Sequence, residues 1–320
     1  MSASRPAPII FNARGTRPDV RLRVFDTEFH VSSTILRLYS AHFLKAFGWP
    51  GPETQSSGNS GAFKYEWDTI VEEDGDWVLV SASTIDPKKN HPEALKGEKE
   101  VHIRVLNSLL CAMYREPFMI ASVNELQQLT KIADYYDALA ALSHSILQPL
   151  VEDRLDIEGD AVLLVHIALK LRHKILFREA VLFLAGNWDD TAFESYIELL
   201  EPKVQKVVKA EREAIGLKVA QAFEFLTSIR SQVWIVSQQL SRLEQDSEAT
   251  VPNVFSEIYH YFEEVDEDAF AVKEKLEQLM ANNVALHVGS GSAGEKSHRN
   301  HFLCSRVPDE DLPWDDKKDF

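Results

Sequence analysis

The sequence predicts an α+β core with a short sheet and about five helices over residues 19–150, followed by an all-α helical domain over residues 151–282. Two segments in which apolar and polar residues alternate, 19–31 and 63–83, indicate the sheet of the core. In the second half, by contrast, apolar residues recur at helical spacing from residue 155 onward. We therefore expect two consecutive domains in one chain.

A short hairpin and two short helices open the core. The stretch DVRLRVF at 19–25 sets apolar residues against arginines, and EFHV follows an Asp-Thr turn. Hydroxyl residues at 32–34 and Ser40 can then accept hydrogen bonds from the first backbone N–H groups of two helices. Together with a helix over 103–114, these elements predict a core made of Val20, Leu22, Phe29, Leu36, Phe43, Phe47, Leu110 and Tyr114.

The middle of the core carries an insertion over residues 48–98. Its first part, 48–62, is rich in Gly, Pro, Ser and Asn and is expected to be exposed, with residues 49–61 mobile. Two strand-like runs around EEDGD then predict a hairpin with an Asp-Gly turn. Helices are expected again over 123–136 and 139–147.

This order of elements resembles the BTB/POZ domain, in the form found in filamentous-fungal proteins, over residues 18–150. The residues that carry the resemblance are Asp19-Val20, Phe29 with Val31, Ile35-Leu36, Ser40 with Phe43, Phe47, Leu109-Leu110 with Tyr114, and IADYY at 132–136. Two positions depart from the family pattern. Ser32-Ser33 stand where the family often has His-Lys or His-Arg, and Tyr114-Arg115-Glu116 replaces Tyr-Thr-Gly.

The resemblance implies a protein–protein interaction module that acts as an adaptor or scaffold and can form a homodimer through the BTB core. In one subclass, substrate adaptors of cullin-RING ubiquitin ligases, a hydrophobic-x-Glu pattern before the fourth helix contacts the cullin. Val123-Asn124-Glu125 fits that pattern, which makes Val123 and Glu125 candidate partner contacts. The alternative is that Glu125 is an acid in the first turn of a helix, where it complements the helix dipole.

The other subclass contains scaffolds and transcription-associated regulators without a role in ubiquitin transfer. No zinc finger, basic region, kelch repeat or MATH domain follows the core, so the helical half would have to supply the further contacts. Its longest pattern, 212–246, has four a/d heptads on one expected helix. This pattern indicates either a seam for self-association or antiparallel packing within the domain.

The overall composition is acidic and rich in apolar residues. A net charge of −16 argues against direct nucleic-acid binding and against an anionic membrane surface. Two cysteines, Cys111 and Cys304, make no disulfide framework, and the first residues lack the apolar region of a secretory signal. We therefore expect an intracellular protein, cytoplasmic or nuclear, whose partners are proteins.

No motif in the sequence predicts catalysis, a cofactor or a metal. The stretch GSGSAG at 289–294 matches G-x-G-x-x-G, but no complete strand–helix unit surrounds it, so we interpret it as a linker. His298, His301 and Cys304 have the spacing of zinc ligands but lack a visible fourth ligand. The sequence therefore favours a binding protein over an enzyme.

Residues 283–320 are expected to form a flexible acidic tail, mobile over 287–297. Leu312 and Trp314 are isolated apolar residues in this tail and are further candidate partner contacts. We expect them to dock into an apolar groove, either on the chain's own helical half or on a separate partner.

Overall fold

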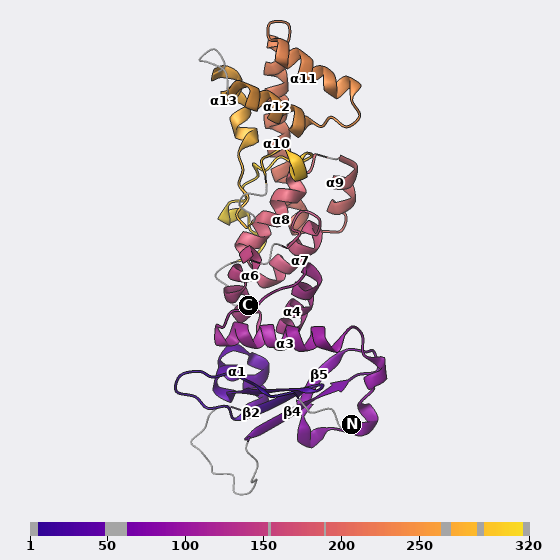
Figure 1. Cartoon of the computed structure of the whole chain (residues 1–320), viewed down its shortest axis with the longest axis vertical. Helices are drawn as coiled ribbons and strands as arrows, with labels where there is room; N and C mark the ends of the chain where they lie inside the picture. Colours follow the sequence, from indigo (N-terminus) through magenta and orange to yellow (C-terminus); the bar gives the residue numbers. More distant parts are fainter. Residues whose placement is uncertain are drawn as a thin grey trace. The chain divides into compact units, whose positions relative to one another are not determined.

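The computed structural model describes residues 6–48, 63–152, 155–188, 190–263, 270–286 and 291–315. The chain divides into two compact units between Asp153 and Arg154. The first unit combines a five-stranded sheet with helices, and the second is helical (Figure 1). The mixed α/β character expected from the sequence is confirmed at this level of description.

The sheet of the first unit has the order β1-β3-β2-β4-β5. A hairpin pairs β2 and β3 antiparallel, β4 joins β2 in parallel, and β5 returns antiparallel beside β4. The strand bounds are β1 (Ile9–Ile10), β2 (Val20–Val24), β3 (Thr27–Val31), β4 (Tyr65–Val71) and β5 (Trp77–Ser81).

Strand β1 lies within residues 1–18, which the sequence indicates to be a polar, proline-bearing lead-in. Ile9 and Ile10 pair in parallel with β3. The next residue, Phe11, is 3% exposed, and its ring lies 5.0 Å from the ring of Tyr114. Two isoleucines therefore suffice to add an edge strand, which is too short to show a recognisable period in the sequence.

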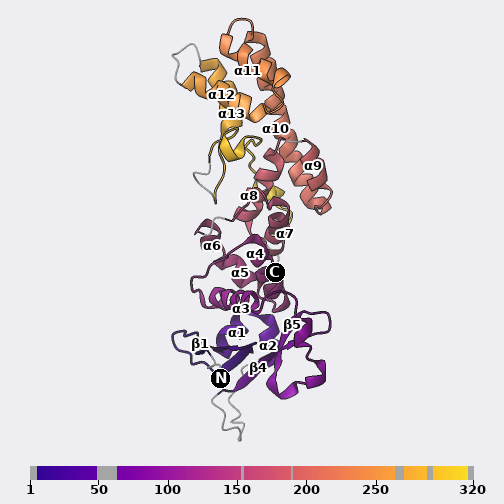
Figure 2. The same ribbon diagram turned by 45° about the vertical axis from the view of Figure 1, so that its right-hand side comes forward.

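The helices of the first unit are shown in Figures 1 and 2. Between β3 and β4 lie two short helices, and three short 3-10 turns precede the longest helix of the unit. The first part of the expected insertion, 48–62, falls, apart from Gly48, outside the described residues, as does the stretch 49–61 expected to be mobile. The bounds are α1 (Ser33–Tyr39), α2 (Ala41–Phe47), α3 (Lys99–Tyr114), α4 (Val123–Tyr135), α5 (Leu139–Ser145) and α6 (Leu147–Glu152).

The core of the first unit centres on Phe43. Its ring stacks between Phe47, at 5.4 Å, and Tyr136, at 5.2 Å. The Ser40 hydroxyl accepts a hydrogen bond from the Phe43 N–H and donates to the Tyr136 carbonyl, so it caps α2 and ties it to the end of α4. The other predicted core residues are also buried, except for half-buried Tyr114: Val20, Leu22, Phe29, Leu36, Phe47 and Leu110.

The second unit is built from α7 (Ala161–Leu171), α8 (Lys174–Gly186), α9 (Asp190–Ile197), α10 (Pro202–Ile229), α11 (Trp234–Gln245), α12 (Val251–Glu263) and α13 (Phe270–Met280). The heptad pattern does not lie on one helix, because the chain turns between Ile229 and Trp234. Val219 and Leu226 on α10 and Leu240 on α11 are buried. Because α10 packs on α8 and α13, and α11 on α12, the seam positions pack within the unit.

The expected flexible tail is wrong over residues 291–315, which are part of the second unit. Phe302 and Leu303 are fully buried, and Cys304 is 5% exposed. Main-chain bonds hold the segment, because the Phe302 N–H donates to the Gly186 carbonyl at 2.9 Å. The sequence prediction failed here because a polar, glycine-rich composition hid a short apolar run, whose contact with the end of α8 joins residues more than a hundred positions apart.

Buried His301 gives the stability of the second unit a predicted pH dependence. Burial lowers its pKa below 6.5, His298 and Arg212 act in the same direction, and Glu158 opposes them. The unfolded state therefore binds more protons below pH 6.5, so the free energy of unfolding should fall as pH decreases through that value.

The pH dependence can be measured by urea titration of the full chain from neutral pH to about pH 5, in the wild type and in His301→Gln. Hydrogen exchange of α8 amides would report on the second unit alone. The variant should lose less stability on acidification than the wild type. Equal losses of stability in the two proteins would show that the pKa of His301 does not differ between the folded and unfolded states.

Candidate functional site

The predicted contacts Val123 and Glu125 lie at the start of α4, where both are buried. Val123 is 4% and Glu125 3% exposed. The Ser122 hydroxyl caps the helix by accepting the Glu125 N–H at 3.2 Å. The carboxylate of Glu125 accepts two hydrogen bonds from the Arg104 guanidinium, both at 2.8 Å. Glu125 is thus an intramolecular anchor of α4, and its choice as an open partner contact has to be corrected.

The other two predicted contacts, Leu312 and Trp314, pack on the second unit itself. Leu312 is 8% exposed, and the ring of Trp314 meets that of Phe177 on α8 edge-on at 5.2 Å. Asp309, just before them, forms ion pairs with Arg178 and Lys174 on the same helix. Of the two alternatives for this segment, the structure contains the intramolecular one.

Leu312→Ala is expected to lower the melting temperature of the second unit by several degrees. Truncating a buried leucine costs about 2–5 kcal/mol, and each kcal/mol shifts the midpoint by about 2–4 °C in a unit of this size. Differential scanning calorimetry of the full chain would measure the shift. Leu199→Ala is the matched control, because Leu199 is 64% exposed in the same unit. An unchanged midpoint for Leu312→Ala would contradict the observed docking.

The first unit contains a groove of about 970 Å³, which we call the α3–α6 groove. It lies between the C-terminal end of α3, the turn that follows, and helices α5 and α6, which Figure 2 labels. Apolar side chains dominate its lining, with Arg115, Glu116, His144 and Glu152 among the polar ones. Leu147 and Val151 on α6 line it and are 42% and 49% exposed. The groove is therefore an open, mainly apolar surface of the kind that accommodates another polypeptide.

The wall of the groove at the end of α3 is rigid. Arg115 has φ +59°, in the left-handed region, and the N–H of Glu116 donates to the Cys111 carbonyl at 2.9 Å. The Tyr114 hydroxyl accepts the Ser32 N–H at 2.6 Å, which joins α3 to the start of α1. Burial raises the pKa of Tyr114 to about 12, so this phenol stays protonated. These hydrogen bonds hold one wall of the groove in place.

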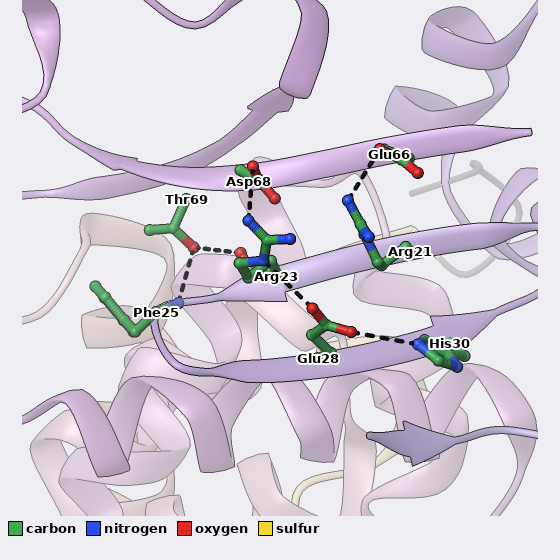
Figure 3. Close-up of polar contacts among 8 residues, drawn as sticks. All are labelled: Arg21, Arg23, Phe25, Glu28, His30, Glu66, Asp68 and Thr69. Atoms are coloured by element: carbon green, nitrogen blue, oxygen red, sulfur yellow. Dashed lines mark hydrogen bonds and ion pairs between the residues drawn. The ribbon is translucent and has the colours of Figure 1, made fainter. Parts of the chain in front are cut away.

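A second surface, the charged sheet face, consists of ionisable side chains on three neighbouring strands (Figure 3). Arg21 pairs with Glu66 on β4 at 2.9 Å. Arg23 lies between Asp68 on β4, at 3.4 Å, and Glu28 on β3, at 3.5 Å. The imidazole Nε2 of His30, on β3, lies 3.6 Å from the carboxylate of Glu28.

Each arginine of the charged sheet face pairs with a carboxylate of the same face. The side chains are between 17% and 37% exposed, so each pair contributes little stability but fixes the register of β2 against β3 and β4. At the turn of the hairpin, Phe25 has φ +54°, and Thr69 accepts its N–H at 3.4 Å (Figure 3). The alternation in VRLRV predicts from the sequence that Arg21 and Arg23 point away from the core. Their partners on β4 become apparent only from the parallel pairing of β2 with β4 in the structure.

The two thiols are buried, and two of the imidazoles, those of His298 and His301, lie beside a carboxylate. Burial raises the pKa of Cys111 to about 11 and also raises that of Cys304, which disfavours thiolate chemistry. His298 and His301 both contact the carboxylate of Glu158, at 2.8 and 3.4 Å. Within the part of the chain that the structure describes, no three His, Cys, Asp or Glu side chains are placed to hold one metal ion.

Comparisons of this chain with protein-family models, with curated proteins and with solved structures found no match. Among the described residues, none of the helices has the length and apolar character needed to cross a bilayer.

Proposed function

We propose that this chain is a protein–protein interaction adaptor or scaffold with a BTB/POZ-type core. The observation that carries the proposal is the α3–α6 groove, in which exposed Leu147 and Val151 offer apolar surface. Support also comes from the order of elements, in which a β2–β3 hairpin precedes two short helices and β4 pairs in parallel with β2. The hairpin followed by two short helices agrees with the order of elements that the sequence resemblance implies.

Two subclasses of partner follow from the resemblance. A substrate adaptor would connect a cullin-RING ubiquitin ligase to a target, whereas a scaffold or transcription-associated regulator would bring other proteins together without ubiquitin transfer. Because Glu125 is occupied by Arg104, the adaptor form of the proposal rests on the α3–α6 groove and not on the hydrophobic-x-Glu pattern. In both subclasses the partners are proteins, and a homodimer through the core belongs to the proposal.

The test is affinity purification with mass spectrometry from cells of the source organism. The full chain is compared with Leu147→Asp/Val151→Asp, which places charge in the groove. Leu199→Asp/Leu217→Asp is the matched control, because those leucines are 64% and 63% exposed in the second unit. Circular dichroism would verify that all three proteins fold.

Each outcome has a defined meaning. A cullin recovered with the wild type and the control, but lost with the groove variant, supports the adaptor. Chromatin or cytoskeletal proteins lost in the same way support the scaffold. If the groove variant retains every partner that the control retains, the α3–α6 groove is not the binding surface and the proposal fails in this form. Sedimentation of the purified chain would measure self-association.

A further inference from the structure

Helix α10, with 28 residues, is the longest helix that the structure describes. One side of it, which includes Val204, Val208 and Ile215, is buried, and the helix packs on α8 and α13. The opposite side is exposed over a length of about 30 Å. We call it the α10 outer face and define it by exposed residues three, four or seven positions apart, which helical geometry places in one row: Lys203, Lys206, Ala210, Leu217, Ala220 and Glu224.

The centre of the α10 outer face is apolar. Ala210, Leu217 and Ala220 are all exposed, and Leu217 is 63% exposed. The two alanines allow the axis of another helix to come close, and the leucine supplies surface that such a contact would remove from water. A single exposed leucine is ordinary, so the charges at the two ends of the face decide what fits it.

The two ends of the face carry charges of opposite sign. Lys203 and Lys206 lie at the N-terminal end, and Glu224 lies seventeen or more positions further along the helix. The ion pairs of the second unit that the structure describes use other side chains, and none joins one of these three residues to another described residue. The face is therefore self-complementary when two copies of it meet in opposite directions.

The charges of α10 also oppose its own helix dipole. Its first turn contains Lys203 and no acid, and its last turn contains no base. A cation near the N-terminus and an anion towards the C-terminus are both unfavourable for a single helix. An antiparallel second helix reverses this effect, because each lysine-bearing end then lies beside the C-terminal half of the other helix and its Glu224.

We propose that the α10 outer face binds the α10 outer face of a second copy of this chain, with the two helices antiparallel. A two-fold axis midway between residues 206 and 224 brings Lys206 opposite Glu224 of the second copy. The same axis brings Ala210 opposite Ala220 of the second copy, so the small residues meet where the helices approach each other. The symmetry forms each of these contacts twice.

Glu213 and Leu217 lie opposite each other across this axis. The methylene groups of a glutamate can cover a leucine while its carboxylate stays in water. Lys209 lies one turn before Glu213 on the same helix and offers that carboxylate a cation at i,i+4 spacing. The central position is thus compatible with the contact, although it adds less than a second leucine would.

The contact is expected to be weak and reversible. Its ion pairs are exposed and its apolar strip is narrow, which places it among small, transient interfaces. It is separate from a homodimer through the core of the first unit and from the α3–α6 groove, so these proposals can fail independently. Recovery of a groove partner does not depend on it, and Leu199→Asp/Leu217→Asp keeps its meaning as the control for the groove.

The test is sedimentation equilibrium of the full chain at several concentrations. Lys206→Glu and Glu224→Lys should each weaken self-association at least about fivefold, because each turns two attractive pairs into two repulsive ones. The double variant Lys206→Glu/Glu224→Lys should return to within about twofold of the wild type. An equimolar mixture of the two single variants should associate similarly, since both pairs re-form between unlike chains.

Lys275→Glu and Glu274→Lys on α13 are the charge-matched controls, because both residues are exposed in the same unit and lie outside α10. They should leave self-association unchanged. Thermal unfolding shows whether a variant folds: neither Lys206→Glu nor Glu224→Lys should lower the midpoint, since each removes a charge that opposes the dipole of α10.

Three outcomes would overturn the inference. The first is a wild type that associates no more strongly than either single variant. The second is a double variant, or a mixture of the single variants, that stays as weak as the single variants alone, since only antiparallel pairing restores both contacts. The third is an equal loss of self-association in the α13 controls, which would assign the effect to net charge.

Discussion

Phe43→Ala is expected to lower the free energy of unfolding of the first unit by about 3–5 kcal/mol. The ring is 2% exposed and stacks between Phe47 and Tyr136, so its removal deletes two aromatic contacts at once. The neighbouring residues cannot easily collapse into the space, because the Ser40 hydroxyl donates a hydrogen bond to the Tyr136 carbonyl and holds the two residues in place. Part of the cost is therefore a residual cavity.

The measurement is a urea titration of the full chain, followed by hydrogen exchange of the amides of β2 and β3, which report on the first unit alone. Leu38→Ala on α1 is the control, because Leu38 is 67% exposed and its truncation should change stability by less than about 0.5 kcal/mol. A loss below about 1 kcal/mol for Phe43→Ala would show that the ring is not central to the core.

Gly186→Ala is expected to destabilise the second unit by about 1–3 kcal/mol or more. A Cβ at Gly186 would lie 1.9 Å from the carbonyl oxygen of Phe302, which is backbone and cannot rotate away. The added methyl group must therefore displace the segment that contains Phe302. Because Phe302 is fully buried, the displacement would also expose that ring.

Gly216→Ala on α10 is the matched control for this change. A Cβ at Gly216 meets no atom within 4 Å, so alanine should be neutral or stabilise the helix by up to about 1 kcal/mol. Urea titration would compare both variants, and limited proteolysis would measure access to residues 291–315. If Gly186→Ala matches Gly216→Ala in stability and in cleavage rate, the observed crossing of this segment over α8 is wrong.

The sequence predicted the local elements of the first unit closely, because their signals are local. The alternation of Val20, Leu22 and Val24 gave β2, and the Ser40 cap gave the start of α2. The parallel pairing of β2 with β4 was not predicted, since it joins segments about forty residues apart and depends on which side chains meet. For the same reason, the salt bridges of the charged sheet face appeared only in the structure.

Candidate sites were harder to predict than elements, because exposure is a property of the assembled unit. Glu125 carries the signal of a partner contact, but Arg104, twenty-one positions earlier, occupies its carboxylate. Leu147 and Val151 look like ordinary helix residues in the sequence, and only the arrangement of α3, α5 and α6 leaves them open.

The burial of Phe302 and Leu303 bears on how the second unit is made by the ribosome. Helix α8 leaves the ribosome more than a hundred residues before the segment that covers it. During that interval Glu179, which later accepts the N–H groups of Ala285 and Leu286, lacks these two donors. Synthesis should therefore pass through a nascent helical bundle with exposed apolar surface, which makes chaperone binding during translation and rapid degradation of prematurely terminated chains the expected behaviour.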